Sequence, residues 1–250
     1  MCLCLKKHVI PTTPVNMELK NIYRGDEVKF VAMFRALRSA LLADFIAAHP
    51  DFLTGENAYI VGQGFGIDFN KDGSLTHNPI DSSLYTNRKE VWSTVGLKSP
   101  AVGLSYKNQS IYRACYPTAF ALIEMFGDAC KMSGYSILEP GAIIYRHTGL
   151  EDRAAKNIRV HIPLHVPQGD IGFEVEGETV IWDDVFSFND QKLHSAWNNT
   201  SQRRLILFVD LTREKCDLPP APAHFPGCNA HVPVFEKTRD PKYKPLTNLL

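Results

Sequence analysis

The sequence predicts a mainly β protein whose helices are confined to the N-terminal half. From Gly134 to Val209, short runs rich in β-branched and aromatic residues follow one another with no helical pattern between them. Before Gly134, two apolar stretches have helical spacing, at residues 28–48 and 117–126. Closely spaced strands without intervening helices form an antiparallel sandwich or barrel, so we expect the helices to pack against its outside.

The N-terminal half is expected to hold two helices separated by loops. Residues 1–25 are expected to be a flexible start. With Asp26 as N-cap, a helix is predicted from Val28 to Ala48, ended by His49-Pro50. Residues 57–110 are rich in Gly, Asn, Asp and Ser and predict loops with two or three short strands. A second helix is predicted over Pro117–Phe126, with Gly127 after its end.

The strands expected after Gly134 are separated by turn residues at 139–141, 168–170 and 176–178. They are Ser136–Leu138, Ala142–Arg146, Ile158–Val166, Gly172–Val175, Thr179–Trp182, Val185–Phe188 and Arg204–Val209. After them the chain is rich in proline and loses all periodicity. We expect one domain, with a flexible start (1–25), a helical and loop-rich part (26–133), a strand core (134–212) and a Pro-rich extension (213–250).

Composition excludes several classes of partner. Lys+Arg and Asp+Glu are both 27, so the 250-residue chain has no net charge with which to collect nucleic acid or an anionic membrane. It also lacks an apolar run long enough to span a bilayer, and we expect a cytoplasmic protein. The six cysteines show no C-x-x-C pair and argue against a structural zinc site. A small molecule, an amino acid or a peptide is the expected partner.

Histidines in strand-like sequence are the candidate metal ligands. A barrel of strands has an open end where side chains of different strands converge, which suits a metal held by imidazoles. Four histidines qualify by position: His147, His161, His165 and His194. His161 and His165 are four residues apart, and a regular strand would place both on one side. A histidine on a strand more often has a structural role, so the residues alone leave the ligand pair open.

Six segments have an order and spacing that resemble the aspartyl/asparaginyl β-hydroxylase family of iron(II)- and 2-oxoglutarate-dependent oxygenases. They are Pro117–Phe126, Tyr135–Gly141, His147-Thr-Gly149, Arg159-Val-His161, His194-Ser-Ala-Trp197 and Arg204–Asp210. Each segment is a weak motif alone, but their succession is specific. The resemblance covers a little over a third of the chain. It implies a double-stranded β-helix, the jelly-roll or cupin-like barrel.

The resemblance also implies a metal site. His147 and His194 would bind iron(II). Most related oxygenases have a carboxylate two residues after the first histidine, where this chain has Gly149, as the named family does. Water would then complete the coordination, and the alternative is a carboxylate from Glu151 or Asp152.

A dicarboxylate cosubstrate requires a cation for its far carboxylate. The planar guanidinium of Arg204 suits that role, and Ser136 would donate a second hydrogen bond. The family pattern implies that Arg159 and His161, which share one face of a strand, contact the other end. The alternative for Arg159 is a surface salt bridge. Arg203 alternates to the opposite face from Arg204 and is expected to be exposed to solvent.

Three further positions receive weaker assignments. The resemblance makes His165 a core or substrate-side residue rather than a ligand. Trp197 is expected to pack near the open end of the barrel, as an ordinary core residue rather than a functional one. Asn189 and Asp190 stand where the family has a pair of acidic residues, which leaves the role of this pair open.

The implied activity is hydroxylation of a C–H bond with iron(II), 2-oxoglutarate and O₂, at the β-carbon of an Asp- or Asn-like residue or amino acid. One alternative is a halogenase, since a small residue in place of the carboxylate can leave room for a halide on iron. Another is a non-catalytic jelly-roll binding module. The sequence predicts neither the exact substrate nor the oligomeric state.

Overall fold

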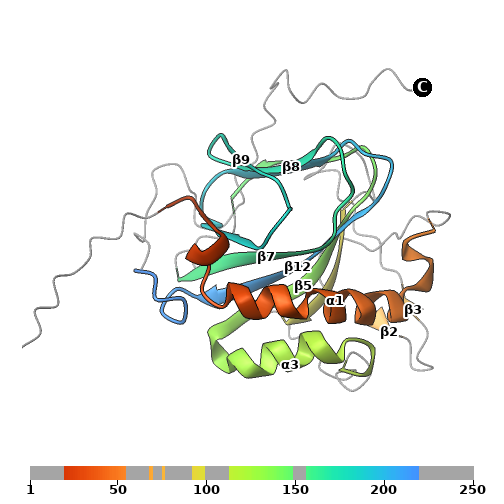
Figure 1. The fold of residues 1–250 in the computed structure, drawn as a ribbon, viewed down its shortest axis with the longest axis horizontal. Coiled ribbons are helices and arrows are strands. Elements are labelled where there is room, and N and C mark those ends of the chain that lie inside the picture. The colour runs from red at the N-terminus through yellow and green to blue at the C-terminus, as the bar shows by residue number, and fades with distance from the viewer. Residues whose placement is uncertain are drawn as a thin grey trace, which may run out of the picture.

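The computed structural model describes residues 20–54, 92–98, 113–148 and 156–219, and the backbone of 68–69 and 75–76. Two β-sheets face each other, and two helices cover the outer side of the larger sheet (Figure 1). No helix in these ranges is long and apolar enough to cross a membrane. Most of the loop-rich part, the segment 149–155 and the chain after residue 219 lie outside the described residues.

The larger sheet has six strands in the order β1-β10-β7-β12-β5-β4, and the smaller has four in the order β6-β11-β8-β9. A separate two-stranded sheet pairs β2 (Asp68–Phe69) with β3 (Leu75–Thr76). The other strands are β1 Ile22–Arg24, β4 Trp92–Lys98, β5 Cys130–Leu138, β6 Ala142–His147, β7 Asn157–His165, β8 Ile171–Val175, β9 Glu178–Val180, β10 Phe186–Phe188, β11 His194–Asn198 and β12 Arg204–Thr212.

From β5 onward the chain passes back and forth between the sheets. β5, β7, β10 and β12 belong to the six-stranded sheet, and β6, β8, β9 and β11 to the four-stranded sheet. Neighbouring strands are antiparallel, with β12 paired to both β5 and β7 and β11 paired to both β6 and β8. This is the double-stranded β-helix that the resemblance implied, and the mainly β prediction is confirmed.

Two hydrophobic layers result from the alternation of side chains along the strands. On β12, Leu205, Leu207 and Val209 face the helices, whereas Ile206 faces the other sheet. The helix-side layer joins the six-stranded sheet to α1 (Val31–Ala48) and α3 (Pro117–Phe126). The layer between the sheets is rich in aromatic side chains. Polar residues on the inner faces are therefore enclosed by the barrel.

Several element boundaries differ from the prediction. α1 begins at Val31, because Gly25–Glu27 form a separate 3-10 turn (η1) and Phe30 precedes the helix in the left-handed conformation, so Asp26 is not its N-cap. Ile22–Arg24 pairs with β10 and is not a flexible start. The first strand of the core begins at Cys130 rather than Gly134. The helix Pro117–Phe126 and the end of α1 at Ala48 are confirmed.

Candidate active site

Two histidines meet on the inner face of the four-stranded sheet. His147 is the last residue of β6 and His194 the first of β11, and they are directly paired in the ladder. Their ring centroids are 4.2 Å apart. His194 is 4% exposed and contacts Phe173 and Phe188, so the pair borders the aromatic layer between the sheets. The local register, set by the strands, brings together two residues that are far apart in the chain.

Each imidazole is oriented by the backbone carbonyl of the residue two positions before it. His147 Nδ1 lies 2.7 Å from Tyr145 O, and His194 Nδ1 lies 2.8 Å from Lys192 O. A carbonyl can only accept, so both rings carry their proton on Nδ1, which leaves the Nε2 lone pairs for a metal. Burial lowers the pKa of His147 and of His194 to about 3, and the neighbouring imidazole adds to the effect at His147. Both rings are therefore neutral at physiological pH, as ligands must be.

These two imidazoles fit a metal ion that takes further ligands from solvent or cosubstrate. Within the described residues no group of three or more His, Cys, Asp or Glu could hold a metal ion by itself. In the described part of the chain, the carboxylate of Asp190 lies close to the pair, with its Oδ1 3.5 Å from His194 Nε2. Gly149, Glu151 and Asp152 lie outside the described residues, so the predicted place of the absent carboxylate is not tested.

Arg204 is a cation buried inside the barrel. It is 1% exposed, and its Nη1 donates to Ser136 O and Ser136 Oγ at 3.0 and 3.1 Å. Its guanidinium stacks over Trp182 at 4.7 Å, and its buried Nε has no hydrogen-bond partner. In the described part of the chain no carboxylate pairs with it. Burial lowers the pKa of Arg204 to about 9, so the guanidinium is charged at neutral pH without an anion to offset its desolvation.

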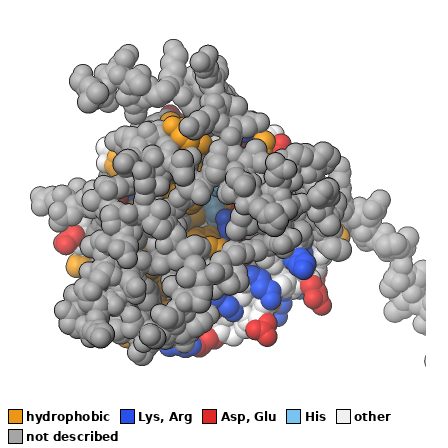
Figure 2. Space-filling view, turned by 180° about the vertical axis from the view of Figure 1, so that it is seen from behind, with side chains coloured by type: hydrophobic (Ala, Val, Ile, Leu, Met, Phe, Trp, Pro, Cys, Tyr) orange, Lys and Arg blue, Asp and Glu red, His pale blue; other side chains and the backbone are white. Residues whose placement is uncertain are grey.

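Trp92 connects this cation to the histidines. Its Nε1 donates to Ser136 Oγ at 3.1 Å, and its ring lies 6.2 Å from that of His147. Ser136 Oγ thus accepts from both Trp92 and Arg204, and its own hydrogen remains for a ligand. Seen from the side opposite to Figure 1, histidine, basic and hydrophobic side chains are visible together near the centre of the molecule (Figure 2).

Arg159 lies on the other side of the histidines, among carboxylates. Its Nε and Nη2 donate to Asp210 at 2.7 and 2.8 Å, and its Nη1 donates to Asp190 at 3.0 Å. Burial opposes its charge, but Asp190 and Asp210 together raise the pKa of Arg159 above its usual value. The Asp190 carboxylate is therefore bonded to Arg159 and lies close to His194, with its Oδ1 3.5 Å from the unprotonated Nε2. This is a partly buried network rather than the surface salt bridge considered as the alternative.

His161 stands within the aromatic layer. Its ring lies 5.1 Å from each of Phe173, Phe186 and Phe188, and Trp182 Nε1 donates to its Nδ1 at 3.3 Å. The accepting Nδ1 places the proton of the neutral ring on Nε2. Burial, with the charges of Arg159 and Arg204 nearby, holds the pKa of His161 well below its usual value. His161 is a neutral donor between the two cations.

Comparison with known proteins identifies the family. A family model described as aspartyl/asparaginyl β-hydroxylase matches residues 70–214, more than half of the chain. The chain belongs to the aspartyl/asparaginyl β-hydroxylase family. The matched segment contains His147, His161, His194, Arg159 and Arg204.

Curated relatives of this hydroxylase family member share short aligned regions. The ornithine lipid ester-linked acyl 2-hydroxylase of Rhizobium tropici is 29% identical over 126 residues, which cover 49% of this chain and 42% of the relative. The aspartyl/asparaginyl β-hydroxylase of Mus musculus is 31% identical over 111 residues, covering 42% of this chain and 14% of the relative. The chain thus spans less than half the length of these relatives.

Two solved structures align with part of the chain. A 2OG-Fe(II) oxygenase family oxidoreductase of Burkholderia pseudomallei has a TM-score of 0.34 and 14% identity, covering 49% of this chain and 69% of that one. A predicted oxalate decarboxylase of Thermotoga maritima has a TM-score of 0.28 and 16% identity, covering 36% of this chain and 73% of that one.

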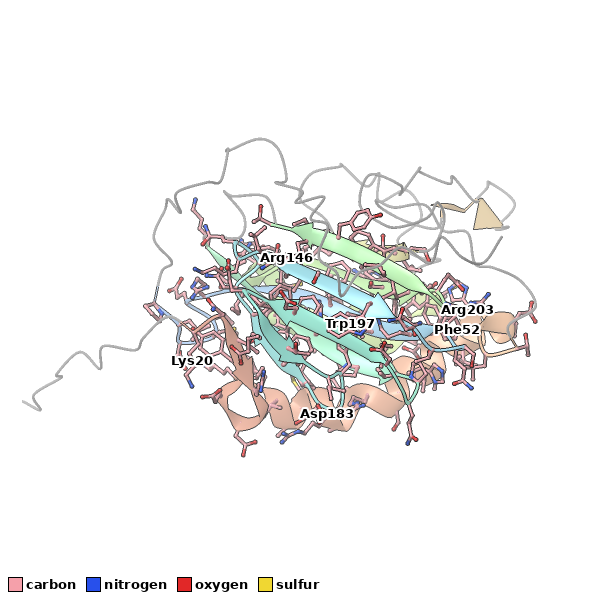
Figure 3. The ribbon with its side chains drawn as sticks, turned by 90° about the horizontal axis from the view of Figure 1, so that it is seen from above. Lys20, Phe52, Arg146, Asp183, Trp197 and Arg203 are labelled. Atoms are coloured by element: carbon pink, nitrogen blue, oxygen red, sulfur yellow. The ribbon has the colours of Figure 1, made fainter. Side chains whose placement is uncertain are left out.

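Two predictions about individual residues of this family member are wrong. Arg203 is buried rather than exposed: it donates to both oxygens of Glu139, donates to Phe52 O at 3.0 Å and lies over the Phe52 ring. Figure 3 shows Arg203 and Phe52 together. Trp197 packs over Gly172 on the outer face of the four-stranded sheet and donates to Asp170 at 2.8 Å, away from the histidines.

His161 and His165 do not share a face of β7. The β7–β12 ladder has an irregularity between the pairs Leu205–His165 and Ile206–Pro163, which shifts the alternation by one residue. His165 consequently lies against Phe52 on the helix side, with ring centroids 6.1 Å apart. The pair that local spacing alone would have suggested as ligands is therefore separated by the sheet.

Three residues beside the site were not predicted from the sequence: Trp92, Trp182 and Asp210. Trp92 lies in the stretch expected to be mostly loops, and its strand was not located. Asp210 ends the last resemblance segment, and its position two residues beyond Phe208 on the inner face of β12 was the available signal. For Trp182, no pattern in the sequence distinguished a partner of Arg204 from ordinary core.

Proposed function

We propose that this protein is an iron(II)- and 2-oxoglutarate-dependent hydroxylase. The observation that carries the proposal is the buried guanidinium of Arg204, which pairs with no carboxylate of the described residues. It lies inside the same barrel as two imidazoles whose Nε2 atoms are left for a metal. A buried cation without a counter-ion is costly to the fold, and a carboxylate ligand removes that cost. Membership of the hydroxylase family supports the same activity.

His147 and His194 would hold the iron through Nε2, with Nδ1 fixed by Tyr145 O and Lys192 O. When bound, iron(II) with 2-oxoglutarate and O₂ supplies oxidation of a C–H bond to an alcohol, with 2-oxoglutarate converted to succinate and carbon dioxide. Asp190, whose Oδ1 lies 3.5 Å from His194 Nε2, would place a negative charge close to the metal. The enclosing phenylalanines exclude water from this chemistry.

Arg204 and Ser136 would bind the far carboxylate of 2-oxoglutarate. Arg204 offers its unpartnered Nε, and Ser136 offers the hydroxyl hydrogen that Trp92 and Arg204 leave free. Arg159 and His161 are assigned to the keto-acid end. The donors of Arg159 are engaged with Asp210 and Asp190, so a cosubstrate carboxylate would share them. His161 accepts from Trp182 at Nδ1 and would donate its neutral Nε2–H.

For the substrate we propose the β-carbon of an Asp- or Asn-like residue or amino acid, in a peptide or a small molecule. The names of the mouse and human relatives support this class. The Rhizobium relative, named as an acyl 2-hydroxylase, adds acyl chains linked to amino acids to the substrates that merit testing.

The test combines turnover with product mass. Purified protein with iron(II), ascorbate and 2-oxoglutarate is incubated with a panel of Asp- and Asn-containing peptides, free amino acids and N- or O-acylated amino acids. We expect succinate formation coupled to a gain of one oxygen atom that derives from ¹⁸O₂, and its loss in His147→Ala. Added chloride or bromide should leave the product mass unchanged, whereas a halogenated product would establish the halogenase alternative. Failure to bind iron(II) would instead favour a binding module.

A further inference from the structure

The turn between β8 and β9 contains an unusual residue. Val175 and Glu178 are paired across a two-residue hairpin, and both turn residues, Glu176 and Gly177, have positive φ angles of 50° and 86°. Such turns favour Asn or Gly at the first position, because a residue with a Cβ is strained in the left-handed region. Glu176 occupies this position although a smaller residue would suit the backbone better.

Glu176 makes two bonds to a single residue across the sheet. Its backbone N–H donates to Leu193 O at 2.9 Å, and its side-chain Oε1 accepts from Leu193 N–H at 3.1 Å. In an antiparallel ladder, a hydrogen-bonded pair normally exchanges two backbone bonds. Here the left-handed backbone of Glu176 has turned away, and its side-chain carboxylate supplies the second acceptor. The Glu176 side chain thus extends the β8–β11 ladder by one pair beyond Val175–His194.

Leu193, which Glu176 holds in this way, lies in the chain between His194 and Lys192. The Lys192 carbonyl is the one that orients the His194 ring. His194 Nδ1 bonds Lys192 O, the carbonyl on the N-terminal side of Leu193. The peptide between Lys192 and Leu193 contains both that carbonyl and the N–H that Glu176 Oε1 binds. Since a peptide unit is planar, fixing its N–H also fixes the direction of its C=O. Lys192 N–H is held in turn by Asn189 O at 2.9 Å.

We infer that Glu176 is a positioning residue for His194. Its carboxylate holds the Lys192–Leu193 peptide plane, the plane aims Lys192 O at His194 Nδ1, and the imidazole then presents Nε2 toward His147. The role in metal binding rests on the proposed function. The Glu176 side chain bonds Leu193 N–H, so the effect of its carboxylate on the site passes through that peptide group.

Four variants of the full-length chain separate this role from turn strain. Glu176→Ala removes the acceptor and keeps the strained Cβ. Glu176→Gly removes the acceptor and relieves the strain. Glu176→Gln keeps an amide oxygen that can accept from Leu193 N–H. Glu178→Ala removes a carboxylate of the same hairpin that pairs instead with Arg24, and is the matched control.

Two measurements are made on each variant: cobalt(II) affinity from its visible absorption, and the ¹⁵N NMR signals of labelled histidine in the metal-free protein, with His194 assigned through His194→Gln. We expect Ala and Gly at position 176 to weaken cobalt(II) binding by about tenfold and to shift the Nδ1 signal of His194. Glu176→Gln and Glu178→Ala should match the wild type within about twofold in affinity.

Wild-type affinity and an unchanged His194 signal in Glu176→Gly would overturn the inference. If Glu176→Ala fails to fold, Glu176→Gly alone tests the loss of the acceptor for Leu193 N–H. If the wild-type protein itself binds no cobalt(II), the proposed function fails, while the His194 signal in the metal-free variants still decides whether Glu176 orients the ring.

Discussion

Arg203 and Arg204 are neighbours in the chain, but among the described residues only Arg203 has a carboxylate that compensates its charge. Arg203 is matched by Glu139 on the helix side of the sheet, whereas Arg204 has no carboxylate partner among the described residues on the inner side. Alternation along a strand correctly predicted that the two point to opposite faces. It could not predict that Phe52, from the segment after α1, covers the face of Arg203, because that contact spans 151 residues of sequence.

Replacing each arginine by methionine should therefore give opposite results. Arg204→Met should raise the dissociation constant of 2-oxoglutarate by roughly 30-fold or more, since loss of a buried charge partner costs about 2–5 kcal/mol. It should leave the free energy of unfolding of the metal-free protein unchanged or higher, because an uncompensated buried charge is removed. Anaerobic calorimetry with iron(II) and urea unfolding measure the two quantities.

Arg203→Met is the matched control for that experiment. It leaves the Glu139 carboxylate buried without its cation, so the free energy of unfolding should fall by about 3–5 kcal/mol. The affinity of the folded fraction for 2-oxoglutarate should not change. Equal effects of the two substitutions on affinity would contradict the assignment of Arg204 to the cosubstrate.

At the scale of elements, sequence patterns located the helices and strands whose hydrophobic residues repeat with a clear helical or strand periodicity. The helix Pro117–Phe126 and most core strands were placed this way. β1 was missed, and β4 and β11 were expected only as unlocated strands, β4 within 57–110 and β11 around His194. All three are short or lie in loop-like sequence and are defined by pairing with distant partners. Of the site, His147, His194, Ser136 and Arg204 were available through the resemblance, whereas Trp92 depends on the β4–β5 pairing.

The β4–β5 pairing also makes a stability prediction. Gly134 lies where a Cβ would stand 2.7 Å from Val95 O and 3.1 Å from the Phe208 ring. Since backbone cannot move aside cheaply, Gly134→Ala should lower the free energy of unfolding by about 1–3 kcal/mol, measured by urea unfolding.

Gly127 serves as a comparison that separates the effect of steric crowding from that of backbone strain. At Gly127 the added Cβ would have no heavy atom of the described residues within 4 Å apart from its chain neighbours, so its positive φ of 53° is what opposes alanine. Gly127→Ala should cost on the order of 1–2 kcal/mol without disturbing the sheet. An unchanged stability of Gly134→Ala would show that β4 is not held against β5 as described.

At the scale of the whole molecule, the buried charge of Arg204 links folding to ligand binding. On the proposed function, 2-oxoglutarate with iron(II) binds the folded chain alone and stabilises it by about 2.7 kcal/mol at a hundredfold excess over the dissociation constant. Anaerobic thermal unfolding should show a higher Tm with both ligands than with iron(II) alone. Succinate, which lacks the keto group, should give a smaller shift, and Arg204→Met should remove most of it. A wild-type Tm indifferent to 2-oxoglutarate would contradict the proposal.

The distribution of the site over two sheets has a mechanical consequence. Both imidazoles belong to the four-stranded sheet, whereas Arg204 and Ser136 belong to the six-stranded sheet that the helices support. A dicarboxylate held by the metal at one end and by Arg204 at the other would link the two sheets directly. Its conversion to succinate would replace the keto-acid group at the metal end by a single carboxylate, so each turnover would weaken the link between the sheets at the moment when the product must leave.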